Sequence, residues 1–415
     1  MKIIIPFIVI FLYIQNVAYS QPAFPVEKTK SVITSGSQNT SSLNLTVTAL
    51  IEALYVAGKT SMSLSPTITV ELHDATSKAG IESRIGSLST AGVGTFSFTS
   101  AVNGTPYYIV IKSVNTVETW SANPQSFTAG SLSYDFTTGV SKAYTDGSNP
   151  PMALHNGKWC IYSGDLNQDG FVSGDDFTGV DNDNTLFNYH PINDLNGDGF
   201  ISGDDDTFID NNNSAFIGKQ IPPGVPSNTI TYSGQTYNTV LIGTQWWLKE
   251  NLNVGARING TQNQSNNGNI EKYCYNDSLI NCSRYGGLYQ WNEAMQYVTT
   301  EKAQGVCPSG WHIPSNSEIT TLVTNVGSDG NELKAVGQGG GLGSGTNISG
   351  FSALLSGSSA SDGSFSDVAN YGYFWSSTQY NITLSRLMTL DTFDNNIGQG
   401  QSNNANGFSV RCLKN

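Results

Sequence analysis

An acidic segment of twelve residues that occurs twice, 29 residues apart, constrains the fold more than any other feature of the chain. Residues 165–176 read DLNQDGFVSGDD and residues 194–205 read DLNGDGFISGDD. Calcium takes roughly six to eight oxygen ligands, and an EF-hand-type loop supplies them from positions 1, 3, 5, 7, 9 and 12, with glycine at position 6. Both segments carry suitable residues at all of these positions. The sequence therefore predicts two calcium ions held in loops that arose by internal duplication.

The position of each residue in the loop defines its expected role. The phenylalanine at position 7 would coordinate through its main-chain carbonyl, so we expect its ring to be free to pack inward. Three carboxylates in one shell repel one another without a cation. An acidic turn without metal is the alternative, because Asp-Gly is also an ordinary turn signal, but two complete matches favour calcium. The predicted ligands are Asp165, Asn167, Asp169, Phe171, Ser173 and Asp176 in the first loop, and Asp194, Asn196, Asp198, Phe200, Ser202 and Asp205 in the second.

The N-terminus has the pattern of a cleavable signal peptide over residues 1–20. Lys2 precedes an apolar run at 3–14, and small residues stand at Ala18 and Ser20, which is the order of regions found in such peptides. The run is too short to span a membrane comfortably. We therefore expect a polar leader at 21–40 and a secreted or cell-surface protein with no membrane span after cleavage.

Composition favours an extracellular, β-rich protein with many turns. Gly, Ser, Asn and Thr are abundant, and charged residues make up only 12% of the chain. The net charge is −13, and twelve Asp with no Lys or Arg lie between residues 165 and 210. This excess argues against nucleic acid or an anionic membrane as a partner, whereas a divalent cation would be its natural counter-charge.

Short alternating apolar runs at 43–138, separated by turn signals such as Asn103-Gly104, predict strands. Several such strands over about 100 residues favour an immunoglobulin-like β-sandwich at 41–150, and a less regular β-meander is the alternative. A proline-rich segment then marks a stiff linker at 219–228. The composition changes again after it, so we expect a separate domain at 229–415 and a fold class that is mainly β and multi-domain.

The five cysteines predict two disulfides in an oxidising compartment. Cys274 and Cys282 are eight residues apart, which suggests a local bridge, and Cys307 and Cys412 would then pair across about 105 residues. Cys160 is left over and is expected to be buried and unreactive. None of the cysteines forms a close CxxC-type pair, so a zinc site is not expected.

The duplicated segment resembles a dockerin, a module in which two calcium loops are each followed by one helix. Position 12 is Asp, and no long helix precedes either loop; both features fit a dockerin better than an EF-hand. The resemblance implies a small α module at 151–218 that docks onto a cohesin-like partner. Loop positions 10 and 11 are Gly174-Asp175 and Gly203-Asp204 instead of the hydroxyl pair common in cellulosomal dockerins, which argues against a standard cellulosomal cohesin. The alternative is a calcium-rigidified unit that packs against the preceding β-domain.

Seven motifs follow one another in the C-terminal region. They are WW and ENLN within 246–253, YCYN at 273–276, YGGLYQW at 285–291, CPSGWHIPS at 307–315, GFSA at 350–353, FWSST at 374–378 and GFSVRC at 407–412. Together they resemble the Fibrobacter succinogenes major paralogous domain, which occurs on secreted and surface proteins. The resemblance implies an α+β, C-type-lectin-like fold for this domain.

That fold raises the question of sugar binding. Calcium-dependent lectins of this kind use a Glu-Pro-Asn or Gln-Pro-Asp loop and a Trp-Asn-Asp set. Neither of the first two tripeptides occurs, and Trp291-Asn292-Glu293 matches the third only loosely, so the sugar site is not carried over. The aromatic residues of the motifs could stack on a glycan, although core packing is the more common reason for them.

The sequence shows no constellation typical of an enzyme. A catalytic site needs a nucleophile with a base, paired acids or an open metal site, and the chain has only four His. His312 with Glu318 could be imagined as a base, but a structural histidine is the better explanation. We therefore predict a non-catalytic adhesion or binding protein that recognises a glycan or a protein and could belong to a polysaccharide-degrading system. The alternatives are an enzyme associated with glycoside hydrolysis and a structural component of a surface layer.

Overall fold

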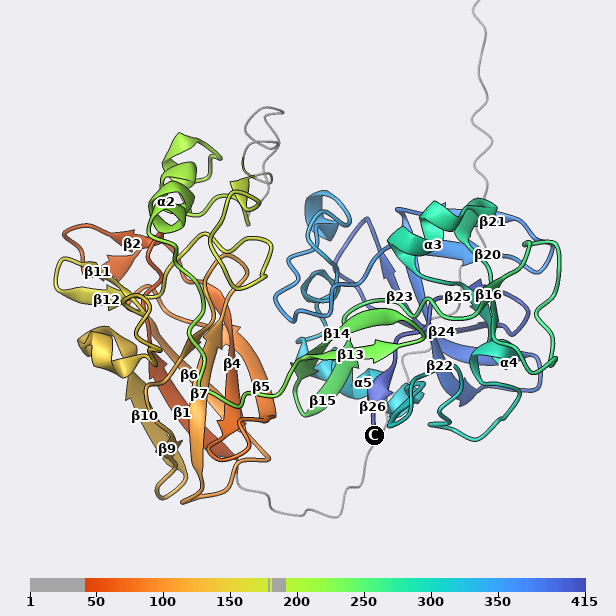
Figure 1. The fold of residues 1–415 in the computed structure, drawn as a ribbon, viewed down its shortest axis with the longest axis horizontal. Helices are drawn as coiled ribbons and strands as arrows, with labels where there is room; N and C mark the ends of the chain where they lie inside the picture. The colour runs from red at the N-terminus through yellow and green to blue at the C-terminus, as the bar shows by residue number, and fades with distance from the viewer. Residues whose placement is uncertain (1–41, 178–179, 181–191) are drawn as a thin grey trace, which may run out of the picture. The chain divides into compact units, whose positions relative to one another are not determined.

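The computed structural model describes residues 42–177, 180 and 192–415. The expected signal peptide and polar leader lie outside the described residues, as does most of the segment that follows the first acidic loop. Within the described part, the chain is mainly β, with several sheets and few helices, as the sequence predicts (Figure 1).

The first domain contains two larger β-sheets and one short two-stranded sheet. Its elements are β1 (Leu43–Thr48), β2 (Tyr55–Val56), β3 (Ser61–Met62), β4 (Thr67–Asp74), β5 (Gly80–Ser87), β6 (Val93–Phe98), β7 (Pro106–Lys112), β8 (Thr119–Trp120), β9 (Gln125–Ser126), β10 (Ser131–Asp135) and the 3-10 turns η1 (Phe136–Thr138) and η2 (Val140–Lys142). One sheet has the order β10-β1-β6, in which β1 runs parallel to β10 and antiparallel to β6. The other has the order β5-β4-β7-β8, with β9 also paired to β7 and every pair antiparallel.

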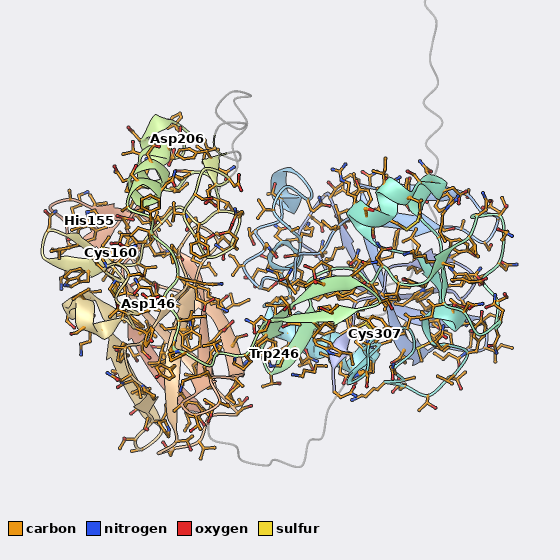
Figure 2. The ribbon with its side chains drawn as sticks, in the orientation of Figure 1. Asp146, His155, Cys160, Asp206, Trp246 and Cys307 are labelled. Atoms are coloured by element: carbon orange, nitrogen blue, oxygen red, sulfur yellow. A yellow bond between two sulfur atoms is a disulfide. The ribbon has the colours of Figure 1, made fainter. Side chains whose placement is uncertain are left out.

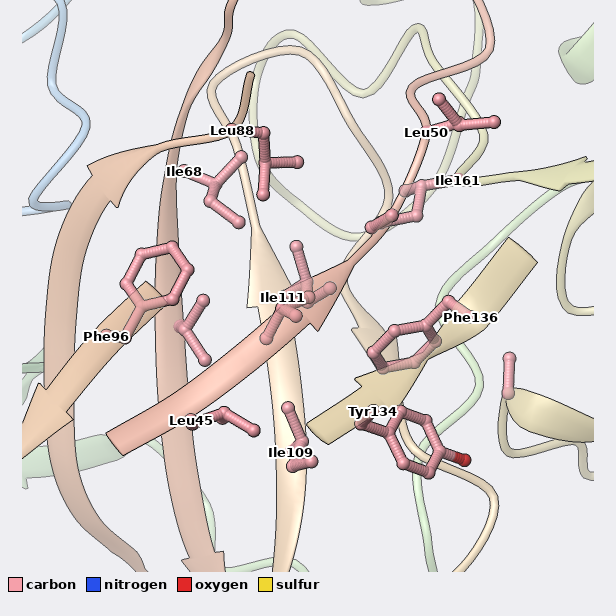
Figure 3. Packing of buried hydrophobic residues seen from close by; sticks show 14 of the residues in the cluster. Leu45, Leu50, Ile68, Leu88, Phe96, Ile109, Ile111, Tyr134, Phe136 and Ile161 are labelled. Carbon is pink, nitrogen blue, oxygen red and sulfur yellow. The ribbon is translucent and has the colours of Figure 1, made fainter. Parts of the chain in front are cut away.

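One hydrophobic core joins these two sheets. Burial alternates along β1 and β6, so every second side chain points to the same face. Leu45 and Phe96 from the first sheet belong to the same buried cluster as Ile68, Ile109 and Ile111 from the second (Figure 3). The first domain is therefore a β-sandwich.

The acidic loops lie in the segment that follows the sandwich. Its described elements are the hairpin strands β11 (Ala153–His155) and β12 (Lys158–Cys160) and the helix α2 (Gly203–Ser214). The helix begins directly after Ser202, which forms a capping box with Asp205 and satisfies main-chain N–H groups at the helix start. Residues of the second loop thus also serve as the N-terminal cap of α2.

The loop-bearing segment shares an apolar cluster with the sandwich. Val172, Leu195 and Ile209 from the segment pack in one cluster with Ala53 and Val117 from the first domain. Burying apolar surface is the main favourable contribution to folding. Packing of the segment against the preceding β-domain, which the sequence left open as an alternative, is therefore present in the structure.

The C-terminal domain combines two larger sheets and one short two-stranded sheet with short helices. Its elements are β13 (Thr229–Tyr232), β14 (Gln235–Ile242), β15 (Gln245–Leu248), β16 (Ala256–Arg257), β17 (Glu271–Lys272), η3 (Tyr275–Asp277), α3 (Leu279–Tyr285), β18 (Tyr289–Gln290), α4 (Trp291–Ala294), β19 (Trp311–His312), α5 (Asn316–Asn325), η4 (Gly330–Glu332), η5 (Gly341–Gly343), β20 (Ser356–Ser359), β21 (Phe365–Val368), β22 (Tyr371–Gln379), β23 (Leu384–Asp391), β24 (Gly398–Asn403), β25 (Gly407–Phe408) and β26 (Leu413–Lys414). One sheet has the order β13-β14-β15-β26-β19, and the other has the order β18-β25-β20-β22-β23-β24, with β21 paired to β20.

A buried arginine connects several of the C-terminal motifs. Arg411 is 1% exposed, and its guanidinium donates hydrogen bonds to Asn251 Oδ1, at 2.8 Å, and to the carbonyls of Leu248 and Phe351. Its charge also lies over the Phe351 ring, 4.4 Å from the centroid. Three of the sequence motifs therefore meet at one structural centre.

Both disulfides that the spacing predicts are present. The Cα atoms are 4.9 Å apart in Cys274–Cys282 and 5.9 Å apart in Cys307–Cys412, whose residues are separated by 105 positions. Cys160 is a buried free thiol, and burial raises its pKa to about 12. A thiol with this pKa stays protonated and unreactive at neutral pH. Figure 2 labels Cys160 and Cys307 in their respective domains.

Candidate metal centre

The first acidic loop is closed by its last residue. Asp176 Oδ1 accepts hydrogen bonds from the main-chain N–H groups of Leu166 and Asn167, at 2.8 and 3.0 Å, and its Oδ2 accepts one from Ser173, at 2.8 Å. Position 12 thereby joins positions 2, 3 and 9. The side chains of Asn167 and Asp169 each accept the N–H two residues further on, which makes two consecutive Asx turns.

The second loop repeats this network. Asp205 Oδ1 accepts the N–H groups of Leu195 and Asn196, at 2.8 and 3.2 Å, and its Oδ2 accepts that of Ser202, at 2.9 Å. Asn196 and Asp198 again form consecutive Asx turns. The duplicated sequence therefore folds into two loops that share their Asx turns and the hydrogen bonds of the closing residue.

The two loops differ at position 1. In the second loop, Asp194 has main-chain N–H donors on both carboxylate oxygens. In the first loop, Asp165 is 2% exposed; its Oδ2 accepts the Gly170 N–H at 3.1 Å, but no described residue donates a hydrogen bond to its buried Oδ1. Burial, and then the charges of Asp176 and Asp169, raise the pKa of Asp165 to about 7.

The loops present mixed oxygen donors. Across residues 42–177, 180 and 192–415, no three His, Cys, Asp or Glu side chains are grouped so that they could hold a metal ion by themselves. A cation in either loop would therefore also need Asn, Ser and main-chain oxygens, which are part of the predicted ligand set. Hard divalent ions such as calcium prefer oxygen donors of this mixed kind.

The phenylalanines at position 7 face solvent, and the expectation that their rings pack inward is wrong. Phe171 is 58% exposed and Phe200 is 73% exposed, whereas Val172 at position 8 is 3% exposed. Ile201, also at position 8, packs against the same cluster as Val172. The chain is extended here, since the Val172 N–H donates to the carbonyl of Ile217 at 2.9 Å. Successive side chains of an extended segment point to opposite sides, so burying position 8 exposes position 7.

A polar contact fixes α2 to the sandwich, and the sequence analysis missed it. Glu52 is 9% exposed, and its Oε2 accepts hydrogen bonds from Asn212 Nδ2 at 2.7 Å and from the Ser163 N–H at 3.2 Å. Asn212 also donates to the Ser163 carbonyl at 2.8 Å. The second loop is held as well, because Ser63 Oγ donates to the Asn196 carbonyl at 2.8 Å. Glu52 and Asn212 are 160 residues apart, so no local pattern could have paired them.

The aromatic residues of the central C-terminal motifs lie in the core. Tyr273, Tyr289 and Trp291 are at most 2% exposed, so their rings are not available to a glycan. Glu293, which loosely matches a lectin ligand, is fully buried and accepts a hydrogen bond from the Tyr297 hydroxyl at 2.8 Å. This segment therefore has a packing role in the structure.

His312 is also fully engaged. It is 5% exposed, with Nδ1 2.7 Å from Asn415 Oδ1 and Nε2 3.1 Å from Glu318 Oε2. Glu318 also closes the capping box at the start of α5 together with Ser315. These contacts hold His312 between Asn415 and the start of α5.

The comparison with protein families identifies the last domain. Residues 240–414 match the family model of the Fibrobacter succinogenes major domain. The C-terminal domain belongs to this family. The match covers the seven motifs of the sequence and the buried Arg411 centre that joins three of them.

Other comparisons are weaker. No curated protein matches the chain. One similar solved structure is a crystal structure of a type II cohesin–X-dockerin complex from Acetivibrio cellulolyticus, at 20% identity over 41% of this chain and 94% of that chain, with a TM-score of 0.27. A similarity at this TM-score supports no conclusion about fold or function. In the described ranges, no helix is both long and apolar enough to cross a membrane.

Proposed function

We propose that this chain is a secreted or cell-surface, non-catalytic binding protein whose residues 151–218 form a dockerin-like module that binds two calcium ions. The observation that carries the proposal is Asp165 Oδ1, a buried carboxylate oxygen without a hydrogen-bond donor among the described residues. It stands in a loop whose other members occupy the spacing of calcium ligands. A bound divalent ion would supply the missing partner and screen the repulsion that raises the pKa of Asp165.

The proposal assigns calcium a structural role. Both loops are closed by position 12, and the second leads directly into α2, which packs against the sandwich through Ile209 and Asn212. Calcium would therefore hold the loops, α2 and their contacts with the first domain in one arrangement. Removal of calcium should loosen residues 160–217 and lower thermal stability, because ligand binding to the folded state stabilises it.

The calcium assignment is tested by titrating the chelator-treated full chain calorimetrically. We expect two ions per chain and an increase in melting temperature. The double variant Asp165→Ala, Asp194→Ala should lose the calcium binding and the increase in melting temperature. Asp362→Ala should behave as the wild type, because Asp362 is an exposed residue of the C-terminal domain. Absence of binding, together with a melting curve unchanged by chelator, would reject the ligand assignment.

The same module is proposed to dock onto a cohesin-like partner. Three of its phenylalanines, Phe171, Phe200 and Phe216, are 58%, 73% and 84% exposed. Large exposed apolar side chains are candidates for contact with a partner. Phe216 also has a positive φ of 53°. Glycine is the usual residue with this conformation after a helix, so the end of α2 does not explain why an exposed phenylalanine stands there.

Docking is tested by measuring binding of a type II cohesin to the calcium-loaded chain. We expect calcium-dependent binding that weakens by about tenfold or more in Phe200→Ser and Phe216→Ser, because exposed aromatic residues often dominate interfaces. Leu154→Ser is the matched control, since Leu154 is 56% exposed on β11, outside the loops. A calcium-loaded chain that does not bind the cohesin would reject this partner and leave the calcium assignment standing.

The C-terminal domain would supply recognition of a glycan or a protein. Since Tyr273, Tyr289 and Trp291 are buried, any glycan must contact other residues. A glycan array probed with the full chain, with and without calcium, tests this part of the proposal. Binding to a defined glycan supports it, whereas no binding accompanied by self-association favours a structural surface component.

A further inference from the structure

The two calcium loops have different surroundings at position 6. A Cβ placed on Gly170 of the first loop would lie 2.6 Å from Cδ and Cε of Lys219 and 2.9 Å from its Nζ, whereas a Cβ on Gly199 of the second loop would meet nothing within 4 Å. The side chain of Lys219 therefore runs across the first loop at Gly170. In the second loop, the equivalent space is open.

The main chain holds Lys219 in this place. Its N–H donates to the Gly170 carbonyl at 2.7 Å, and on the same pair of segments the Val172 N–H donates to the Ile217 carbonyl at 2.9 Å. This short antiparallel pairing joins the first loop to the chain that leaves α2. Among the described residues, the second loop lacks this pairing and has a hydrogen bond to the sandwich, between Ser63 and Asn196.

The charge of Lys219 acts on the first loop. The pKa of Asp165 is raised by burial and by the neighbouring carboxylates, and Lys219 opposes this rise. The first loop thus already has a cation of its own chain beside its carboxylates.

We propose that Lys219 makes the two calcium sites unequal, so that calcium binds the first loop more weakly than the second. This inference rests on the proposed calcium binding. A bound divalent ion and the ammonium repel each other. At the equivalent position of the second loop, a Cβ on Gly199 would meet nothing within 4 Å, so no side chain of a described residue takes this place. Calcium therefore binds the second loop first. A change in calcium concentration then mainly changes how much of the first loop is occupied.

The inference is tested by calorimetric calcium titration of the full chain at low ionic strength. We expect two ions with dissociation constants that differ on the order of tenfold, the size of effect that one charge a few ångströms from a divalent ion produces in a solvent-accessible site. Lys219→Met should tighten the weaker site by about this factor and leave the tighter site unchanged. Lys219→Arg keeps the charge and should keep the difference. Lys59→Met is the matched control, because it removes an exposed lysine of the first domain.

A further variant assigns the weaker site to its loop. Asp165→Ala should remove the weaker site alone, with an unchanged near-ultraviolet circular dichroism spectrum as the check on folding. Two ions bound with equal affinity in the wild type, or equal effects of Lys219→Met on both sites, would overturn the inference while leaving two calcium sites in place. No bound calcium in any variant would overturn both the inference and the proposed function.

Discussion

A buried carboxylate oxygen without a hydrogen bond destabilises a protein unless its charge is compensated. Among the described residues, Asp165 Oδ1 and Glu332 Oε2 are both in this position, but their surroundings differ. Asp165 lies in a loop of oxygen donors with the spacing of calcium ligands, so a cation can relieve its strain. Glu332 has the like charge of Asp329 nearby and belongs to no such loop. We therefore expect that only protonation or substitution of Glu332 removes the destabilising effect of its buried charge.

Glu332 should make the C-terminal domain sensitive to pH. Burial, and then the charge of Asp329, raise the pKa of Glu332 from 4.5 to about 7. The folded state therefore keeps a proton that the unfolded state has lost, and stability falls as pH rises from about 4.5 to about 7. Glu332→Gln has no charge to bury, so its melting temperature should exceed that of the wild type by a few degrees at pH 8, and the difference should vanish below pH 4.5.

Thermal melts from pH 4 to pH 8 measure this effect. Glu301→Gln serves as the control, because Glu301 is exposed in the same domain. If Glu332→Gln and the wild type melt together at pH 8, then burial of the Glu332 charge does not limit stability.

At the scale of single elements, α2 is held by its last turn. Asn212 is 4% exposed and donates from Nδ2 to both Glu52 and Ser163. Asn212→Leu would leave the Glu52 carboxylate with fewer donors in a buried place, which costs about 1–3 kcal/mol. Amide hydrogen exchange in α2 should become faster, and the melting temperature should fall. Asn211→Leu changes an exposed neighbour on the same helix, and equal effects from the two substitutions would contradict this role of Asn212.

The elements also show how far the sequence could be interpreted. The loop boundaries, the closing role of position 12 and the start of α2 depend on residues within twelve positions of one another, so local patterns were enough to predict them. Which of two neighbouring side chains is buried depends on which side of the extended segment faces the core. The sequence analysis expected Phe171 to be buried, but Val172 is buried. The Glu52–Asn212 contact joins residues 160 positions apart, and only the assembled fold brings them together.

The same limit applies to the C-terminal domain. Its motifs could be recognised in the sequence, but their contact with one another could not. Asn251, Phe351 and Arg411 are far apart in the chain and meet only in the folded structure. The family match confirms the identity of the domain at 240–414. The motif residues around Arg411 thus form a buried, hydrogen-bonded centre and not an exposed binding site.

At the scale of the whole molecule, the domain boundary and the disulfides decide how the chain unfolds. Both disulfides lie in the C-terminal domain, so reduction breaks no cross-link in the sandwich or in the acidic loops. The last strand, β26, is only two residues long, yet it pairs with both β15 and β19 in the middle of its sheet. Cys412 immediately precedes this strand, so the Cys307–Cys412 bridge anchors the end of the chain where few hydrogen bonds can hold it.

The two bridges should therefore contribute unequally to stability. Loop-closure entropy gives about 5 kcal/mol for a bridge across 105 residues and about 2.5 kcal/mol for one across 8. Replacing Cys307 and Cys412 by Ser should lower the melting temperature of the C-terminal domain more than replacing Cys274 and Cys282. Differential scanning calorimetry of the calcium-loaded protein compares both double variants with the wild type. A larger loss from the short bridge would show that local geometry outweighs closure of the long loop, since the entropy of the unfolded chain can only favour the opposite order.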